Sequence, residues 1–148
     1  MPRSLTRILV LLAMAATVSL TQLTPASAEL PDRCGVSTYA GPGLTLKACI
    51  SADLSYVRGR VELYINQEGV DFLKVEGSRI DLSARIELSA PPYNTGNHYC
   101  PYNFTAPGVY SCSSYAARTV HGLTYFTVGS LNRNTPQTFP AASPRISP

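Results

Sequence analysis

The chain lacks several features that mark large protein classes. Its 148 residues include no Trp and only two His, and its one long apolar run lies at the N-terminus. No second apolar stretch of the roughly 20 residues needed to cross a bilayer follows, so we predict no membrane span after the leader. No run of Lys and Arg that could neutralise a phosphate backbone occurs, so nucleic acid is not an expected partner.

Motifs for catalysis and metal binding are also missing. The chain has no Gly-x-Ser-x-Gly elbow, and its histidines, His98 and His121, are far apart in the sequence. Zinc sites use closely spaced ligand pairs and calcium loops use regularly spaced carboxylates, and neither spacing occurs. We therefore predict no catalytic residue, no metal site and no cofactor. A small secreted hydrolase remains an alternative, because a Ser-His-Asp triad is defined by geometry.

The apolar run at the N-terminus has the form of a secretory signal peptide. Arg3 and Arg7 precede the apolar residues 8–20, and the small residues 26–28 offer a cleavage point. We predict that residues 1–28 are removed and that the remaining 120 residues are secreted into the extracellular space. Because both arginines leave with the leader, 10 of the 12 Lys and Arg remain against 9 Asp and Glu.

Alternation of polar and apolar residues dominates the middle of the chain. Residues 80–88 alternate without exception, and residues 44–51 and 57–65 follow the same period. Gly59 is the one position on the apolar face of residues 57–65 that lacks an apolar side chain. This period of two predicts half-buried strands. Tyr56 and Tyr64 lie on the polar side of their strand.

Residues 70–76 alternate less regularly. Val70 and Phe72 share one parity, whereas Leu73 and Val75 share the other. A strand with a bulge between Phe72 and Leu73 would explain the shift.

The fold class predicted from this pattern is all-β. Strands over 109–117 and 123–128 complete a set of six, with a seventh over 36–39, and no segment after the signal helix has a helical period. We predict a small antiparallel β-sandwich over residues 29–131, of which an immunoglobulin-like topology is one form. Residues 132–148 are rich in Pro, Ser and Thr and predict a disordered tail.

Four cysteines predict two disulfides in an oxidising compartment. The segment from Gly108 to Cys112 has a Tyr two residues before the Cys, and so resembles the sixth strand of the immunoglobulin family. That resemblance implies a core bridge between Cys49 and Cys112. Cys49, however, shares its strand face with polar residues, and the Trp that the family packs against its bridge is missing.

The local pairing, Cys34 with Cys49 and Cys100 with Cys112, is the favoured alternative. Each bridge would tie a neighbouring strand or loop to the outer face of a sheet. Each closed loop of about a dozen residues would add on the order of 3 kcal/mol by the chain-entropy model.

Residues 93–104 are the candidate binding site. This segment gathers aromatic and amide side chains next to a cysteine, a composition typical of loops that bind an extracellular protein or a glycan. The candidate residues are Tyr93, Asn97, His98, Tyr99, Tyr102 and Phe104. The alternative is that their rings cap one end of the sandwich.

Two other uses of these residues remain open. Cys100, Pro101 and Tyr102 could form the exposed strand of a protease inhibitor, because such inhibitors present a disulfide-held segment from a rigid body. The nine tyrosines could instead mark a face for self-association.

Overall fold

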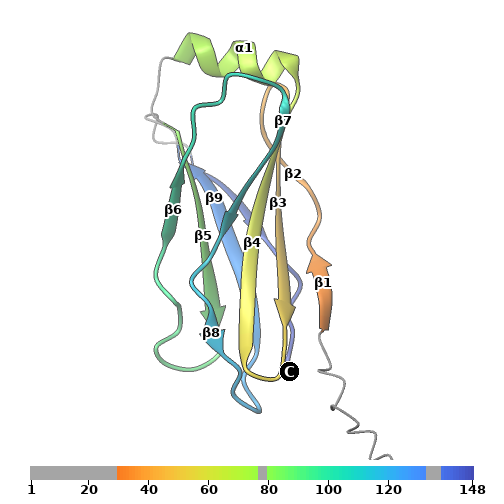
Figure 1. Ribbon diagram of the computed structural model, residues 1–148, viewed down its shortest axis with the longest axis vertical. Coiled ribbons are helices and arrows are strands. Elements are labelled where there is room, and N and C mark those ends of the chain that lie inside the picture. Colours follow the sequence, from red (N-terminus) through yellow and green to blue (C-terminus); the bar gives the residue numbers. More distant parts are fainter. Residues whose placement is uncertain (1–29, 77–79, 133–137) are drawn as a thin grey trace, which may run out of the picture.

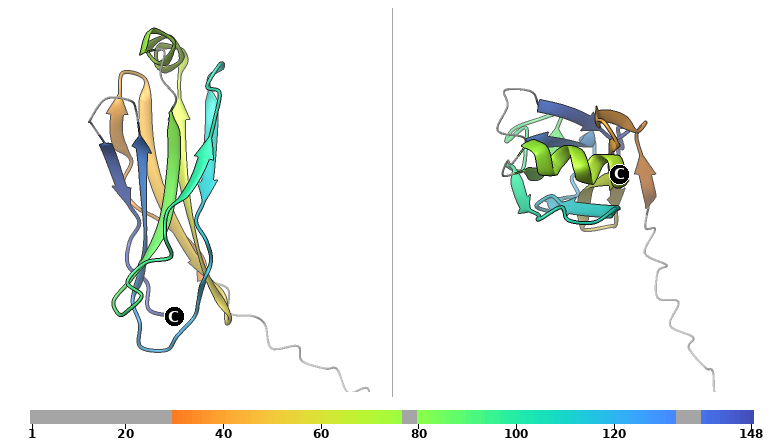
Figure 2. Two further views of the ribbon diagram at one scale, coloured as in Figure 1. Left: turned by 90° about the vertical axis from the view of Figure 1, so that its left-hand side faces the viewer. Right: turned by 90° about the horizontal axis from the view of Figure 1, so that it is seen from above.

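Two antiparallel sheets packed face to face form the protein. The computed structural model describes residues 30–76, 80–132 and 138–148, so the predicted signal peptide lies outside the described residues. The elements are β1 (Leu30–Cys34), β2 (Thr38–Gly41), β3 (Leu44–Ala52), β4 (Tyr56–Ile65), α1 (Gln67–Glu76), β5 (Asp81–Leu88), β6 (His98–Pro101), β7 (Gly108–Ser113), β8 (Ala117–Arg118), β9 (Tyr125–Asn132) and β10 (Thr138–Ala142). Sheet A has the order β1-β3-β4-β7, with β2 on β3 and β8 on β4, and sheet B has the order β10-β9-β5-β6. Figures 1 and 2 show the two layers, with α1 across one end.

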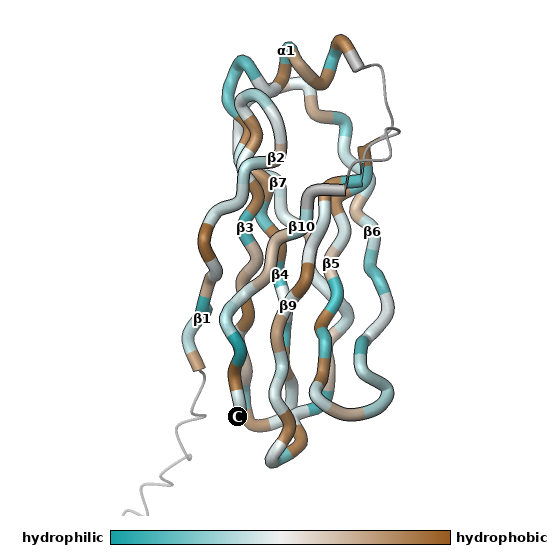
Figure 3. Tube along the Cα trace, turned by 180° about the vertical axis from the view of Figure 1, so that it is seen from behind, coloured by the Kyte–Doolittle hydropathy of each residue, from teal (hydrophilic) through white to brown (hydrophobic). Residues whose placement is uncertain are grey.

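The alternation read from the sequence puts the core between the sheets. In β3, β4 and β5 the alternating aliphatic residues point inward and, apart from the half-buried Leu88, are buried, while their polar neighbours face outward. The same alternation is visible along the chain in Figure 3. The prediction of a small all-β sandwich is therefore confirmed, and the three central strands lie where the periodicity put them.

The sheets approach closely where a glycine on one strand faces a bulky side chain on the other. A Cβ on Gly129 of β9 would lie 2.1 Å from a methyl of Val61 on β4. A Cβ on Gly59 of β4 would lie 2.4 Å from the hydroxyl of Thr127 on β9. Gly59 leaves a gap on the apolar face of β4, and the side chain of Thr127 from the opposite sheet fills that gap.

The strand predicted over residues 70–76 is wrong, because this segment forms the helix α1. The backbone N–H of Gly69 donates to the side-chain oxygen of Asn66 at 2.9 Å, which caps the first turn. Val70 and Leu73 are buried against the core, and Val75 is exposed. The irregular alternation that was attributed to a bulge therefore reflects the three-residue spacing between Val70 and Leu73 on one face of a helix.

The disordered tail predicted over 132–148 is also corrected, for the residues that the structure describes. β10 pairs with β9 from Thr138 opposite Asn132 to Ala142 opposite Val128. Ile146 is buried and exchanges two backbone hydrogen bonds with Tyr125, each 2.9 Å long. The prediction was wrong because it considered only the composition of residues 132–148. β9 supplies the backbone partners and the apolar surface that these residues lack. Residues 133–137 lie outside the described residues.

Several strand boundaries differ from the predicted ones. The strand over 109–117 divides into β7 and β8, and the strand over 123–128 begins later and runs on to Asn132. The seventh strand, predicted over 36–39, is β2. β1 and β6 were not predicted, since both are short and contain proline.

The local disulfide pairing is confirmed. Cys34 and Cys49 lie opposite each other on β1 and β3, and Cys100 on β6 bonds Cys112 on β7. The expected placement on an outer face is wrong for the second bridge, because Cys112 is buried in the core and the bond joins an edge of sheet B to an edge of sheet A. The pairing between Cys49 and Cys112 that the immunoglobulin resemblance implied is thereby overturned.

Asp53 organises the turn between β3 and β4. Its Oδ1 accepts hydrogen bonds from the backbone N–H groups of Ser55 and Tyr56, each at 2.7 Å, and its Oδ2 accepts one from Arg58 at 2.5 Å. These donors, Arg58 foremost, lower the pKa of Asp53 to about 2.

Substitution of Gly129 by Ala tests the close approach of the sheets. We expect the free energy of unfolding to fall by about 1–3 kcal/mol, because the stiff side chain of Val61 cannot move away from a new methyl group. Urea denaturation with both disulfides intact measures the change. Gly108→Ala is the matched control, since its Cβ would meet only a ring atom of Tyr110 at 3.9 Å. Equal losses in the two variants would contradict the close approach.

Asp53→Asn tests the turn through its pH dependence. The amide oxygen can still accept from the turn, but the charge that binds Arg58 is lost. Because folding lowers the pKa of Asp53, its carboxylate stabilises the fold above about pH 4 and loses this effect as the pH falls toward its folded pKa of about 2. Urea denaturation of both proteins across this range should show a stability difference at neutral pH that shrinks steadily as the pH falls from about 4 toward 2. A pH-independent difference would contradict the assignment.

Candidate functional site

The predicted binding segment does not form one site. β6 runs through its middle, so the residues before and after this strand lie at different ends of the sandwich. Tyr93 and Asn97 belong to the connection between β5 and β6, at the end opposite α1 (Figure 1). Tyr102 and Phe104 follow β6 and share a hollow with Leu73 of α1.

Tyr102 and Phe104 form an aromatic cluster with Tyr110 of β7. The ring centroids of Phe104 and Tyr110 are 4.8 Å apart, and those of Tyr102 and Tyr110 are 5.4 Å apart. Phe104 is only 7% exposed. The hydroxyl of Tyr110 donates to the carbonyl of Ala106 at 2.8 Å, four residues upstream, as in a tyrosine corner. These contacts match the capping role considered for the rings.

His98 and Tyr102 close one edge of sheet A. β7 is the last strand of that sheet, and the carbonyls of Ser111 and Ser113 accept hydrogen bonds from side chains. The Tyr102 hydroxyl donates to Ser111, and Nδ1 of His98 donates to Ser113 at 2.5 Å. Side chains that occupy edge carbonyls hinder pairing with another strand.

The His98 imidazole also lies beside the second disulfide. Its ring nitrogen and the sulfurs of Cys100 and Cys112 lie within 4.8 Å of one another. Both sulfurs are committed to the disulfide bond, so neither is a thiolate that could bind a metal.

Three of the candidate residues remain at the surface. Tyr93 is exposed, with a positive φ of 63°, and Tyr99 on β6 is 52% exposed. The amide of Asn97 donates to the Tyr99 hydroxyl at 3.2 Å and accepts from Arg85 at 3.3 Å. This small polar group is the part of the predicted site that still faces solvent.

The segment considered for protease inhibition lies within the sheet. Cys100 and Pro101 belong to β6 and stand opposite Leu82 and Asp81 of β5. The hydroxyl of Tyr102 is held by Ser111. The segment is therefore anchored on both sides rather than projecting from the body.

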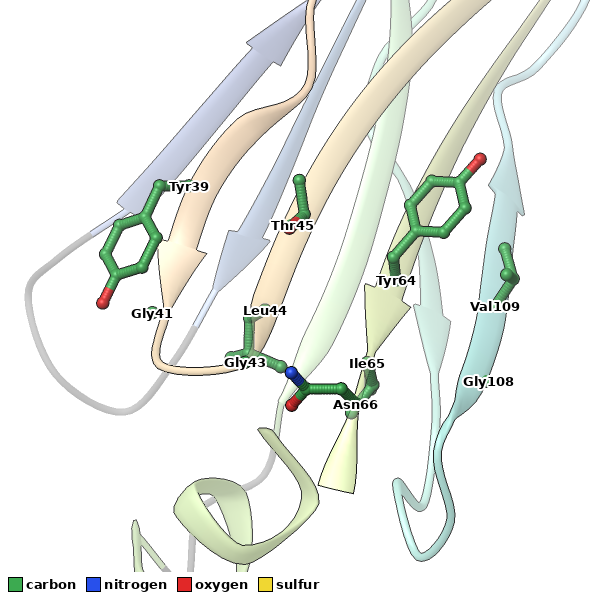
Figure 4. A pocket seen from close by; sticks show the side chains of 10 residues that line it. All are labelled: Tyr39, Gly41, Gly43, Leu44, Thr45, Tyr64, Ile65, Asn66, Gly108 and Val109. Carbon is green, nitrogen blue, oxygen red and sulfur yellow. The ribbon is translucent and has the colours of Figure 1, made fainter. Parts of the chain in front are cut away.

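A second exposed surface, which contains two tyrosines and which the sequence reasoning missed, lies on the outer face of sheet A. Tyr39 on β2 stands opposite Thr45 on β3, Thr45 opposite Tyr64 on β4, and Tyr64 opposite Val109 on β7. We call these four residues the tyrosine row. They cross four adjacent strands in direct register, as Figure 4 shows. Tyr39 is 67% exposed, Val109 57% and Tyr64 36%.

A hollow of about 410 Å³ lies along the tyrosine row. Gly41 at the end of β2, Gly43 of the turn between β2 and β3, Asn66 and Gly108 also line it. The turn is fixed to the start of α1, because the backbone N–H of Asn66 donates to the carbonyl of Gly43 at 3.1 Å. Gly43 has a φ of +64°, and a Cβ there would lie 2.2 Å from the backbone nitrogen of Gly69. Only glycine lets the helix close this end of the hollow.

Charged residues hold one of the two tyrosines in place. The Tyr64 hydroxyl donates to the carboxylate of Glu62 at 2.6 Å, and Glu62 lies 3.0 Å from Arg60, which contacts Asp32 at 2.7 Å. The Glu62 carboxylate raises the pKa of Tyr64, because it stabilises the protonated hydroxyl. The Tyr64 ring is thus oriented before any ligand arrives.

Strand parity alone could indicate only part of the tyrosine row. It placed Tyr64 on the polar side of its strand, but Tyr39 and Val109 join it only through the register of β2 and β7. Those two strands are the edges whose pairing the sequence does not specify.

Comparison with known proteins supplies no relative from which a role could be transferred. No family model matches the chain, and no curated protein or solved structure matches it. Within the described residues, no helix is long and apolar enough to span a bilayer.

Alanine substitutions separate structural rings from exposed ones. Phe104→Ala should lower the free energy of unfolding by about 3 kcal/mol, because it removes a buried ring from the cluster with Tyr102 and Tyr110. Tyr99→Ala should change it by less than about 0.5 kcal/mol, because most of that side chain is already in water. Thermal and urea denaturation measure both. A comparable loss in Tyr99→Ala would show that its ring is structural as well.

Proposed function

We propose that this chain is an exported, non-catalytic binding protein that acts outside the cell. Its ligand surface is the tyrosine row on the outer face of sheet A. The observation that carries the proposal is the direct register of Tyr39, Thr45, Tyr64 and Val109 across four paired strands. A rigid sheet presents these side chains without the ordering cost of a flexible loop.

Export is supported by the leader and by the disulfides. Residues 1–28 have the charged, apolar and small-residue parts of a signal peptide. All four cysteines are paired, and none is free. Disulfides of this kind form and persist in oxidising compartments.

A binding role is supported by the chemistry of the row. Tyrosine offers a large rigid surface at low entropic cost, and it is enriched where proteins bind ligands. The two exposed tyrosines of the row lie on one face in the same register, on strands that flank β3, with Thr45 between them. The hollow between them is open to solvent and gives a ligand room to make contact.

Alanine variants of the row test this function. The wild-type protein is applied to an array that carries glycans and extracellular proteins. Tyr39→Ala and Tyr64→Ala should each weaken binding of the recognised ligand by about tenfold or more, because aromatic anchors contribute most of the binding energy at such surfaces. The melting temperature of Tyr39→Ala should stay close to that of the wild type, because this side chain is 67% exposed. Tyr64→Ala should melt somewhat lower, because Tyr64 is only 36% exposed and bonds Glu62, so binding is measured well below both melting temperatures.

Tyr93→Ala and Tyr99→Ala are the matched controls. Each removes an exposed tyrosine that lies outside the row. Both should bind as the wild type does. Loss of binding in these two variants, with retention in the row variants, would move the ligand surface to the segment around β6 and contradict the proposal.

A further inference from the structure

The ligand class follows from what the tyrosine row offers and what it lacks. None of the residues that line the hollow is charged. The nearest charges on this face, Lys47 and Glu62, stand one row further along β3 and β4, and Glu62 already binds Tyr64 and Arg60. A charged ligand would find no opposite charge in the hollow, so the complementary ligand is neutral.

Peptide recognition by strand addition is not available in the centre of the row. β3 and β4 are each paired on both sides, so their backbone groups are already used in the sheet. An added strand needs a free edge. A ligand seated between the two tyrosines must therefore be recognised by the side chains on the face of the sheet.

The positions of the two tyrosines call for a long ligand. β2 and β4 flank β3, so the backbones under Tyr39 and Tyr64 are two strand spacings apart, or about 10 Å. Figure 4 shows their rings leaning in opposite directions along the sheet, with the short side chain of Thr45 between them. A single small ring cannot contact both, whereas an extended chain of rings can.

Hydrogen-bonding groups accompany the aromatic faces. The Thr45 hydroxyl lies between the rings, and Asn66 lies at the end of the hollow (Figure 4). The side-chain oxygen of Asn66 caps α1, which leaves its amide group as a donor. Gly108 carries no side chain and is half-buried, so a ligand can approach its backbone closely.

These features match a sugar chain. A pyranose ring has a face of C–H groups that packs on the electron-rich face of an aromatic ring, and its hydroxyls bond amide and hydroxyl side chains at its edge. Resting on the binding role proposed above, we infer that the tyrosine row binds a neutral, extended polysaccharide chain, with one sugar on Tyr39 and another on Tyr64.

Isothermal titration with neutral oligosaccharides tests this inference. The probes are the hexasaccharides and disaccharides of cellulose, chitin, xylan and starch, with heparin and alginate as charged comparisons. At least one neutral hexasaccharide should bind, and its disaccharide should bind about tenfold more weakly or not at all, because it reaches only one ring. Binding should not change between low and high salt, since no charge pair forms.

Variants assign the binding to the two rings. Tyr39→Ala and Tyr64→Ala should each weaken hexasaccharide binding by about tenfold and leave the weak disaccharide binding of the other ring. Tyr64→Phe, which keeps the ring and loses the bond to Glu62, should retain most of the affinity. Tyr93→Ala and Tyr99→Ala should bind as the wild type does.

The outcomes separate this inference from the broader function. If the array ligand is a protein lost in both row variants, and no oligosaccharide binds, then the binding role stands and the polysaccharide is wrong. Binding only to heparin or alginate, weakened by salt, overturns the polysaccharide in the same way. If the row variants bind every ligand as the wild type does, then both the inference and the proposed function fail.

Discussion

The contact between β4 and β9 sets the geometry of the whole sandwich. Gly129 leaves room for Val61, and Gly59 leaves room for Thr127, so each sheet fills a gap in the other. At these points the backbone of one sheet contacts a side chain of the other, so the sheets cannot slide or rotate without a steric clash. β4, the strand that carries Tyr64, is therefore fixed against sheet B at Gly59 and Val61.

The second disulfide complements this contact at the side of the sandwich. Cys100 and Cys112 join the edge strands of the two sheets, and the side chains of Tyr102 and His98 occupy carbonyls of β7 beside it. His98 and Tyr102, two residues of the predicted binding loop, thus serve to close an edge. The exposed tyrosines on the paired strands of sheet A form a separate surface that is open to a ligand.

Much of the fold was predictable, because β3, β4 and β5 alternate with a clear period of two. Local disulfide pairing followed from the same parity, since Cys49 faces away from the core side of its strand. The helix α1 was not predicted, because Val70, Phe72, Leu73 and Val75 fit a bulged strand as well as one helix face. Only the docking of Val70 and Leu73 against the core distinguishes the two. β10 was missed for a related reason, since its stability comes from β9.

The sequence by itself determined which residues of the central strands face inward, favoured the local cysteine pairing, and placed tyrosines on the polar faces. These properties are local, because they depend on spacing along one strand or across one short loop. Only the tertiary structure decided which tyrosines stand together. Tyr39 and Tyr64 are far apart in the chain, and the register of β2, β3 and β4 brings them into one row, because strand pairing aligns residues through hydrogen bonds that no single segment contains.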